Sequence, residues 1–384
     1  AGIMAAQYWG KQDAASIEKV IPIALRTNLL FSGLFTILAG FCPEMLMRIF
    51  TNDAALVASG SQYLRAVALS YVLCGISQVY LILLKNTGHA AVSSRISSTA
   101  VVLNIILNAI LIYGLCGAPA LGIRGAAYAT VAARVVELIW AYLETKKPER
   151  VRILWNRLFS SAGKILSEDF WRYTLPVLAA SLVWGIAYVL YSVIMGHMGS
   201  DAVAANSITS IAKSLLSCLI RGVSGGAGVL IGNLLGANEL EKAREYGGRL
   251  SHLSIAIGIV TGGLLMLISP AIVHFAPLSD TAAEYLQYML LFCGLNLMAQ
   301  SVNTTVLDGI FCAGGDAKFD MQGNIGAMWC FSVPLGFLAA FWLKLPVMVV
   351  YCIVNLDEIV KLPAVYHHYK KYIWVRNITR DVED

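Results

Sequence analysis

Polar side chains recur at helical spacing inside three apolar segments of the second half of the chain. The three sets are Ser181, Trp184, Tyr188 and Tyr191; Asn296, Gln300 and Asn303; and Asn206, Ser210, Lys213, Ser217 and Arg221. Steps of three and four residues place side chains on one face of a helix. Polar groups in lipid are costly unless they are paired or face water.

Three such faces in one half of the chain predict a polar, water-containing cavity that binds a substrate. Its aromatic side chains, Trp184 and Tyr188 among them, can stack on flat or cationic compounds. The substrate-cavity candidates are Ser181, Trp184, Tyr188, Asn296, Gln300 and Asn303. The alternative is that these groups hydrogen-bond between helices and contact no ligand.

Three carboxylates are candidate proton carriers. Asp308 ends a long uncharged run, and Asp357 and Glu358 lie in the middle of another segment. An ionisable residue at membrane depth often serves proton or ion transport. Two alternatives stay open: Asp308 could cap a helix beside a glycine pair, and Asp357 could be neutralised by Lys361, four residues later.

The segments that hold these residues are long enough to cross a bilayer. Of the 384 residues, 58% are hydrophobic and 13% charged, whereas soluble proteins have about 25% charged residues. This composition argues against a soluble enzyme, a disordered chain or a disulfide scaffold. Ten segments predict complete transmembrane helices of about 20 mostly apolar residues. They are residues 27–43, 66–84, 96–123, 125–143, 173–200, 203–235, 250–279, 285–307, 321–343 and 346–369.

Lysine and arginine are unevenly divided between the connectors. One alternate set of connectors contains the basic run at 146–172 and the C-terminal tail, and the other holds only Arg48, Arg65, Arg124 and Lys344. The positive-inside rule therefore predicts a multi-pass protein of the cytoplasmic membrane with a cytoplasmic C-terminus. Because the basic residues flank apolar segments, the net charge of +5 indicates membrane orientation rather than nucleic-acid binding. The aromatic residues of the tail, Tyr366–Trp374, suit a membrane interface.

No catalytic signature, metal-ligand spacing or C-x-x-C pair is present among the six histidines and eight cysteines. We therefore expect no enzyme activity, no bound metal and no cofactor other than a coupling ion.

The two halves of the chain repeat each other at an offset of 226 residues. Small residues four apart in the first half, at Gly2, Ala6 and Gly10, match Gly228, Gly232 and Gly236. Parallel repeats predict two helix bundles related by an axis along the membrane normal. The second half has six predicted spans and the first has four and the end of another. The repeat thus predicts that helix 1 and most of helix 2, roughly 58 residues, precede Ala1.

Several short motifs, in this order and spacing, resemble those of the MATE (multidrug and toxic compound extrusion) transporters, in the bacterial DinF- and NorM-like branch. They include Trp9-Gly10-Lys11-Gln12-Asp13, Leu103-Asn104-Ile105-Ile106-Leu107-Asn108, Gly122-Ile123-Arg124-Gly125-Ala126-Ala127, Gly232-Asn233-Leu234-Leu235-Gly236-Ala237 and Ala313-Gly314-Gly315-Asp316-Ala317. The resemblance covers essentially the whole chain. It implies an all-α membrane fold of twelve helices in two six-helix lobes related by a pseudo-twofold axis.

The resulting domain prediction has four parts. The N-lobe is 1–145, a cytoplasmic linker is 146–172, the C-lobe is 173–369 and a cytoplasmic tail is 370–384.

The resemblance also implies a cation-binding site in the first lobe. Asn104 and Asn108 match a motif that is commonly Asn-x-x-x-Asp in the family, and Thr130 matches a threonine of the same site. Here Asn108 keeps the oxygen ligand and lacks the charge. The alternative is that the two asparagines only hydrogen-bond between helices. In the second lobe, Ser181 stands where many relatives have a glutamate.

The function implied is antiport, in which Na⁺ or H⁺ enters while an amphipathic, often cationic, compound is exported by alternating access. We expect a monomer in contact with membrane lipid, with a small-molecule substrate and no nucleic acid. A related alternative is a flippase for lipid-linked oligosaccharide, which the cationic Lys213 and Arg221 would favour. A membrane receptor or intramembrane enzyme is disfavoured by the two-lobe repeat and by the missing nucleophile or metal set.

Overall fold

The structure is a computed structural model that describes all residues except 50–52, 149, 152, 154–157, 159–162 and 381–384. Every regular element in this described part is a helix, as the sequence predicts. Eight helices are long and apolar enough to cross a membrane, so the chain is a multi-pass membrane protein. The chain divides into two compact units. In the described part of the chain, unit 1 contains Ala1–Trp9 and residues of 13–170, and unit 2 contains Gly10–Gln12 and residues 171–380.

Unit 1 is a bundle in which α5 and α7 occupy the centre. Its helices are α1 (Gly2–Gly10), α2 (Ala14–Phe41), α3 (Pro43–Arg48), α4 (Ala54–Val67), α5 (Leu69–Leu84), α6 (Ala90–Tyr113) and α7 (Ile123–Thr145). The central helix α5 packs against α2 and α7, and α7 also packs against α4 and α6. Short turns at η1 (Lys85–His89) and η2 (Leu115–Gly117) reverse the chain between long helices.

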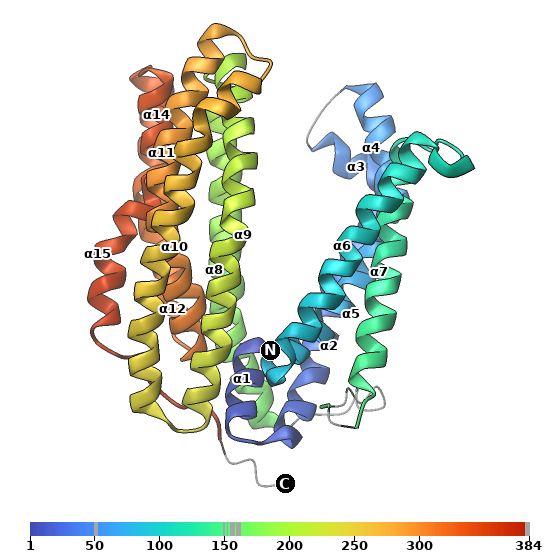
Figure 1. Cartoon of the computed structure of the whole chain (residues 1–384), viewed down its shortest axis with the longest axis vertical. Helices are drawn as coiled ribbons and strands as arrows, with labels where there is room; N and C mark the ends of the chain where they lie inside the picture. Colours follow the sequence, from blue (N-terminus) through green and yellow to red (C-terminus); the bar gives the residue numbers. More distant parts are fainter. Residues whose placement is uncertain (50–52, 149, 152, 154–157, 159–162, 381–384) are drawn as a thin grey trace. The chain divides into compact units, whose positions relative to one another are not determined.

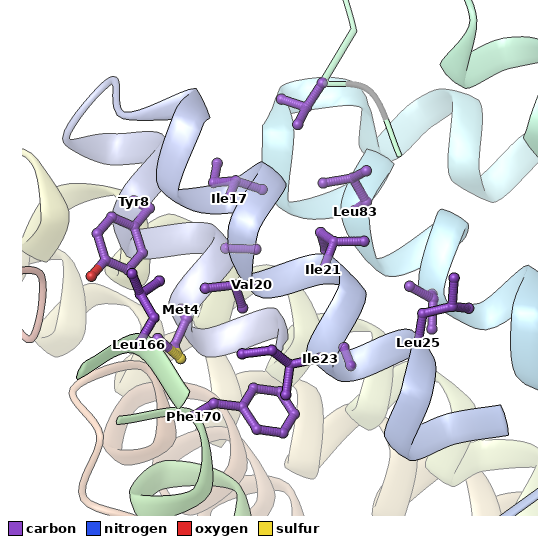
Figure 2. Packing of buried hydrophobic residues seen from close by; sticks show 14 residues of the cluster. Met4, Tyr8, Ile17, Val20, Ile21, Ile23, Leu25, Leu83, Leu166 and Phe170 are labelled. Atoms are coloured by element: carbon purple, nitrogen blue, oxygen red, sulfur yellow. The ribbon is translucent and has the colours of Figure 1, made fainter. Parts of the chain in front are cut away.

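One end of unit 1 has an apolar core, shown in Figure 2, built from four helices. Met4 and Tyr8 of α1 pack with Ile17 and Ile21 of α2, with Leu83 of α5, and with the start of α8. All of these side chains are almost fully buried. Burial of a large apolar side chain away from water contributes about 1.5–3 kcal/mol. This core therefore holds the short helix α1 against the rest of unit 1.

Unit 2 contains four long helices and a set of shorter, less regular ones. They are α8 (Lys164–Gly196), α9 (Ser200–Gly236), α10 (Leu240–Phe275), α11 (Asp280–Thr304), η4 (Thr305–Phe311), α12 (Ala317–Asn324), η5 (Ile325–Ser332), α13 (Val333–Phe337), η6 (Leu338–Trp342), α14 (Val347–Val354) and α15 (Asp357–Tyr369). In Figure 1, α9, α10 and α11 run side by side over most of their length. The first residues of α8, up to Phe170, belong to unit 1.

Glycines let α10 and α11 approach closely. A side chain at Gly258 would meet the backbone of Met298 at 2.9 Å, and one at Gly294 would meet the carbonyl oxygen of Gly262 at 2.9 Å. Small residues at such contacts are the usual means by which helices pack in lipid, where no hydrophobic effect drives them together. The glycines therefore allow the short distance between α10 and α11, the helix that carries Asn296, Gln300 and Asn303.

Nine of the ten predicted spans overlap the eight long helices over most of their length, and the predicted span 96–123 ends earlier than expected, at Tyr113. The predicted spans 66–84 and 96–123 form one continuous stretch of helical residues, Leu69–Tyr113. The chain bends inside this stretch at Thr87 and at Gly88, whose φ is +79°. Glycine adopts a positive φ without steric cost. This bend separates α5 from α6.

The prediction of a single helix over 346–369 is wrong. The chain leaves the helix after Val354 and begins a new helix at Asp357, and Figure 1 shows α14 and α15 as two separate helices. A break in a transmembrane helix frees backbone groups that must find other partners. Here the Asn296 side chain donates a hydrogen bond to the carbonyl oxygen of Asn355, so a neighbouring helix supplies the partner.

Two further segments differ from their predicted character. Helix α8 begins at Lys164, inside the predicted linker 146–172. The predicted tail packs on unit 2, where the Trp374 side chain is fully buried in an apolar cluster and is not available to contact lipid. Arg376 donates hydrogen bonds to the carbonyl oxygens of Gly314 and Gly315, each at 2.7 Å. The tail is therefore part of the fold up to these residues.

Candidate functional site

The break between α14 and α15 is the centre of a charged cluster in unit 2. Asp357 and Glu358 stand in the first turn of α15, where free N–H groups and the helix dipole favour negative charge. The Lys361 ammonium lies 3.2 Å from Glu358 Oε1 and 3.5 Å from Asp357 Oδ2. All three side chains are buried. The structure thus has the Asp357–Lys361 pair foreseen from the sequence and adds Glu358 to it.

Residues of α11 bind the broken segment. Asn303 Nδ2 donates to Glu358 Oε2 at 2.8 Å and to the backbone oxygen of Glu358 at 2.7 Å. Asn296 accepts a hydrogen bond from Lys213 Nζ at 3.2 Å while donating to Asn355. Asn296 and Asn303, two of the three residues predicted to share one face of this helix, therefore have hydrogen-bond partners at the break.

Two residues of α12 complete the cluster, and sequence reasoning missed both. Asn324 Oδ1 accepts a hydrogen bond from Lys361 at 3.2 Å, and Asn324 Nδ2 donates to Asp320 Oδ1 at 3.1 Å. The predicted span began at residue 321, so Asp320 was assigned to a connector. The missed signal is the four-residue spacing of an acid and an amide at the start of an apolar run.

Two adjoining cavities in unit 2 bring most of the predicted residues together. The cavity of about 330 Å³ is lined by Ser181, Trp184, Gln300, Asn303, Asp308 and Glu358, with Arg221 and Lys361 among the further residues. The cavity of about 190 Å³ shares Trp184, Arg221, Gln300 and Glu358 with it and adds Tyr188 and Asp357. Asn296 lines neither cavity. A polar hollow with aromatic and charged walls can hold an amphipathic compound.

Both aromatic rings and a charged guanidinium group line these cavities. The rings of Trp184 and Tyr188 stack at 5.4 Å between centroids with an angle of 17°. The Arg221 guanidinium lies 5.8 Å from the centroid of the Trp184 ring, within range of a cation–π contact. A flat or cationic group could take the place of the arginine on that ring.

Asp308 differs from the other carboxylates that line the two cavities, Asp320, Asp357 and Glu358. It lies in the π-helical segment η4, and its side chain is exposed where it lines the larger cavity. No hydrogen bond or ion pair joins its carboxylate to another described residue. Asp316, not Asp308, stands at the N-terminus of α12. The geometry therefore favours a group that meets the contents of the cavity over a helix cap.

Unit 1 has a neutral polar cluster at the residues predicted to bind a cation. Asn108 Nδ2 donates to Asn104 Oδ1 at 3.1 Å, and Asn104 Nδ2 donates to Thr130 Oγ1 at 3.3 Å. Thr130 in turn donates to the backbone oxygen of Ala126 at 2.9 Å. Asn108 Oδ1 is buried and has no hydrogen-bond partner. The structure brings the three side chains together, and their role as cation ligands stays a prediction.

A buried carboxylate in unit 1 is already neutralised. Glu137 of α7 is 1% exposed, and it lies 2.7 Å from Arg134 Nη1 and accepts a hydrogen bond from Ser77 of α5. Its charge is thus matched within one helix turn and tied to a neighbouring helix. This arrangement holds α5 against α7 and leaves the Glu137 carboxylate paired.

Membrane-spanning helices around polar cavities are typical of membrane transporters. The sequence matches the MatE family over residues 1–110 and 176–338, which is more than half of the chain. The chain therefore belongs to the MATE family, whose members are transporters and not enzymes.

Relatives of this family align along most of the chain. The "Uncharacterized transporter YisQ" of Bacillus subtilis is 20% identical over 97% of this chain and 82% of its own length. The "Probable multidrug resistance protein YoeA" of the same organism is 21% identical over 99% and 82%. A "Probable multidrug resistance protein NorM" of Mannheimia succiniciproducens is 23% identical over 80% and 68%.

Solved structures agree with the fold. A MOP superfamily transporter from Pyrococcus furiosus superposes with a TM-score of 0.86 at 18% identity, covering 97% of this chain and 82% of that one. A MATE protein in complex with MaL6 gives a TM-score of 0.85 at 20% identity over the same shares. At this identity the likeness establishes the all-α membrane fold predicted from the sequence.

Proposed function

We propose that this chain is a cation-coupled antiporter that exports amphipathic or cationic small molecules by alternating access. The observation that carries the proposal is the pair of adjoining cavities in unit 2: Trp184, which stacks on Tyr188, lines both of them, and the exposed carboxylate of Asp308 lines the larger one. Two of the relatives described above are named as probable multidrug resistance proteins. The chemistry of the cavity walls fits compounds of that kind.

In this mechanism Asp308 meets the positive charge of the substrate and the aromatic rings hold its flat body. A coupling ion and a substrate exchange only if each prefers a different conformation. Asp308, Asp357 and Glu358 are the groups in unit 2 that could carry a proton between the two states. Of these, Asp308 binds the substrate charge in our proposal, because it lines the cavity without a described partner, and Asp357 and Glu358 are left as the proton carriers.

A cation site in unit 1 is the second part of the proposal. Asn104, Asn108 and Thr130 supply side-chain oxygens in one connected group, and Asn108 Oδ1 is free to accept. Hard cations take oxygen ligands from amides and hydroxyls. Na⁺ and H⁺ both remain candidates for the coupling ion.

The remaining parts concern the whole molecule in its membrane. We propose a monomer in the cytoplasmic membrane with a cytoplasmic C-terminus, as the distribution of lysine and arginine favours. We also propose that the fold follows the twelve-helix family plan of two lobes related by a pseudo-twofold axis.

The test is export of cationic dyes from cells that lack their own main efflux pumps. Cells that express the full-length protein are expected to accumulate less dye than cells with the empty vector. An ionophore that collapses the ion gradient should abolish the difference. The matched control is Asp308→Asn, which keeps the shape of the side chain and removes its charge. Equal accumulation of several cationic dyes in all cells, with and without the ionophore, would count against efflux.

A flippase for lipid-linked oligosaccharide is the second candidate, because Arg221 and Lys213 place positive charge at the cavities. The transporter from Pyrococcus furiosus is itself described as having a binding pocket of reverse polarity that suggests a different function. The discriminating measurement is translocation of a fluorescent pyrophosphate-linked lipid in proteoliposomes. Translocation lost in Arg221→Gln, without dye export in cells, would favour the flippase.

A further inference from the structure

The Lys361 ammonium is surrounded by oxygen atoms from two helices. Glu358 Oε1 and Asn324 Oδ1 each lie 3.2 Å from it, and Asp357 Oδ2 lies at 3.5 Å. The lysine is 5% exposed. A lysine ammonium is a compact point charge with three donors, and here three oxygens surround it.

The same set of oxygens has the composition of an alkali-cation site. Hard cations prefer carboxylate and amide oxygens. A further oxygen is available, because Asn303 Oδ1 is buried without a hydrogen-bond partner while its amide nitrogen binds Glu358. Asn303, Asn324, Glu358 and Lys361 all line the larger cavity. A small ion in place of the ammonium would thus have two carboxylates, an amide oxygen and this unused oxygen within the cluster.

We propose that Lys361 occupies an alkali-cation site as a tethered cation, which keeps Na⁺ out of unit 2, and that removing its ammonium opens the site to Na⁺. A buried carboxylate without a countercharge is strongly destabilising. Without the lysine, Asp357 and Glu358 must recruit another cation. Na⁺ from solution can reach them through the cavity that Glu358 lines.

Other charged residues near the cluster contribute to the electrostatic potential that an incoming ion would meet. Asp320 is bonded to Asn324, and Asp308 lines the same cavity, so both add negative charge. Arg221 and Lys213 line the adjoining cavity and add positive charge. Arg221 and Lys213 belong to α9, whereas Lys361 is the basic residue that forms ion pairs with Asp357 and Glu358 in the described part of the chain. Because it is nearer to these carboxylates, its removal changes the electrostatic potential at them more than removal of either α9 residue.

The role of this site in transport rests on the proposed function. If the chain is an antiporter, a tethered cation in place of Na⁺ leaves protons as the ions that unit 2 can exchange. Ion binding to the purified protein is measured without any export. A failure of dye export and a failure of Na⁺ binding are therefore separate results.

The test compares the unchanged full-length protein with Lys361→Ala in NaCl and in choline chloride at equal ionic strength. We expect the thermal midpoint of the unchanged protein to be the same in the two salts. Lys361→Ala should be less stable in choline and recover in NaCl, and should bind ²²Na⁺ at least about tenfold more tightly than the unchanged protein. The matched control is Lys213→Ala, because Lys213 contacts a single amide oxygen and its loss should create no Na⁺ dependence.

A neutral cluster distinguishes ion binding from simple misfolding. Lys361→Ala combined with Asp357→Asn and Glu358→Gln removes the charge that attracts Na⁺ and should show no preference for NaCl. The proposal is overturned if this triple variant folds while Lys361→Ala fails to fold even in NaCl. It is also overturned if Na⁺ stabilises the triple variant equally, or if the unchanged protein binds Na⁺ through Asp357 and Glu358.

Discussion

The two units place polar groups among apolar helices in different ways. In unit 1 the chain from Asn108 through Asn104 to Thr130 carries no formal charge, and its members depend on weak neutral hydrogen bonds. In unit 2 two carboxylates and an ammonium meet at a helix break. Removing one neutral partner at membrane depth costs about 0.6 kcal/mol, whereas breaking a buried ion pair costs about 3–5 kcal/mol. The neutral cluster of unit 1 can therefore exchange partners at low cost, whereas the charged cluster of unit 2 holds its partners firmly.

The largest effect is expected from Glu358→Ala, which leaves Lys361 with one carboxylate partner. Loss of a buried partner should lower the free energy of unfolding by about 3–5 kcal/mol and abolish dye export. Unfolding of the purified protein and dye accumulation in cells measure the two effects. The control is Glu245→Ala, because Glu245 pairs with Arg249 on the exposed surface of α10 and should change stability by less than about 1 kcal/mol. Similar losses in both variants would show that the buried charged cluster contributes no more to stability than an exposed ion pair.

Asn108→Ala tests whether the neutral cluster of unit 1 binds a cation. Removal of one oxygen ligand should reduce export about tenfold, which equals about 1.4 kcal/mol of binding, while stability falls by only about 0.6 kcal/mol. Export at varied ion concentration and thermal unfolding measure the two quantities. Asn108→Asp, which keeps the oxygen and adds charge, serves as the control and should retain export. Unchanged export in Asn108→Ala would assign the cluster to helix packing alone.

Asp308→Asn tests the charge that faces the larger cavity of unit 2. Cationic dyes should need about a fivefold higher concentration for half-maximal export, a loss near 1 kcal/mol, because one attractive charge is removed. Neutral amphipathic compounds should be exported as before. The matched control is Asp201→Asn on α9, whose carboxylate binds Ser279 on an exposed surface. An equal change for neutral and cationic compounds would show that the charge does not select the substrate.

The smallest effect is expected from Trp184→Leu, which removes the stacked ring from the cavity wall. Flat aromatic cations should be exported about two- to threefold less well, because a cation–π contact at an exposed site contributes about 0.5 kcal/mol at the lower end of its range. Compounds without aromatic rings should be unaffected. Trp342→Leu is the control, since Trp342 is 84% exposed and lines neither of the two cavities. A general loss with both variants would indicate a packing effect.

The sequence predicted the long helices and the residues of the cavity better than it predicted their partners. Apolar length gave nine of the ten spans, because the requirement to satisfy backbone groups in lipid leaves little choice. The spacing of Ser181, Trp184 and Tyr188 predicted a shared helix face, and the structure places these residues at the two cavities. Helical periodicity is a local property and can be read from one segment.

The helix break and its partners could not be read in that way. Residues 346–369 look like one apolar span, and the break at Asn355 depends on Asn296, which lies 59 residues earlier in the chain. The contact of Asn324 with Lys361 likewise joins separate helices. The spacing of Asp357 and Lys361 did predict their pairing, because that contact lies within one helix. Contacts across helices depend on packing, which a single sequence does not specify.

The break between α14 and α15 has a consequence for how the protein is made. Helix α14 has 8 residues and α15 has 13, so at 1.5 Å per residue neither spans a hydrocarbon core of about 30 Å by itself. Three charged residues in α15 would each oppose insertion by about 2.5–3.5 kcal/mol at the bilayer centre. Their partners on α11 and α12 leave the ribosome first. The last segment therefore enters the membrane by docking onto a bundle that is already in place, and biogenesis of this end of the protein waits for the assembly of the helices before it.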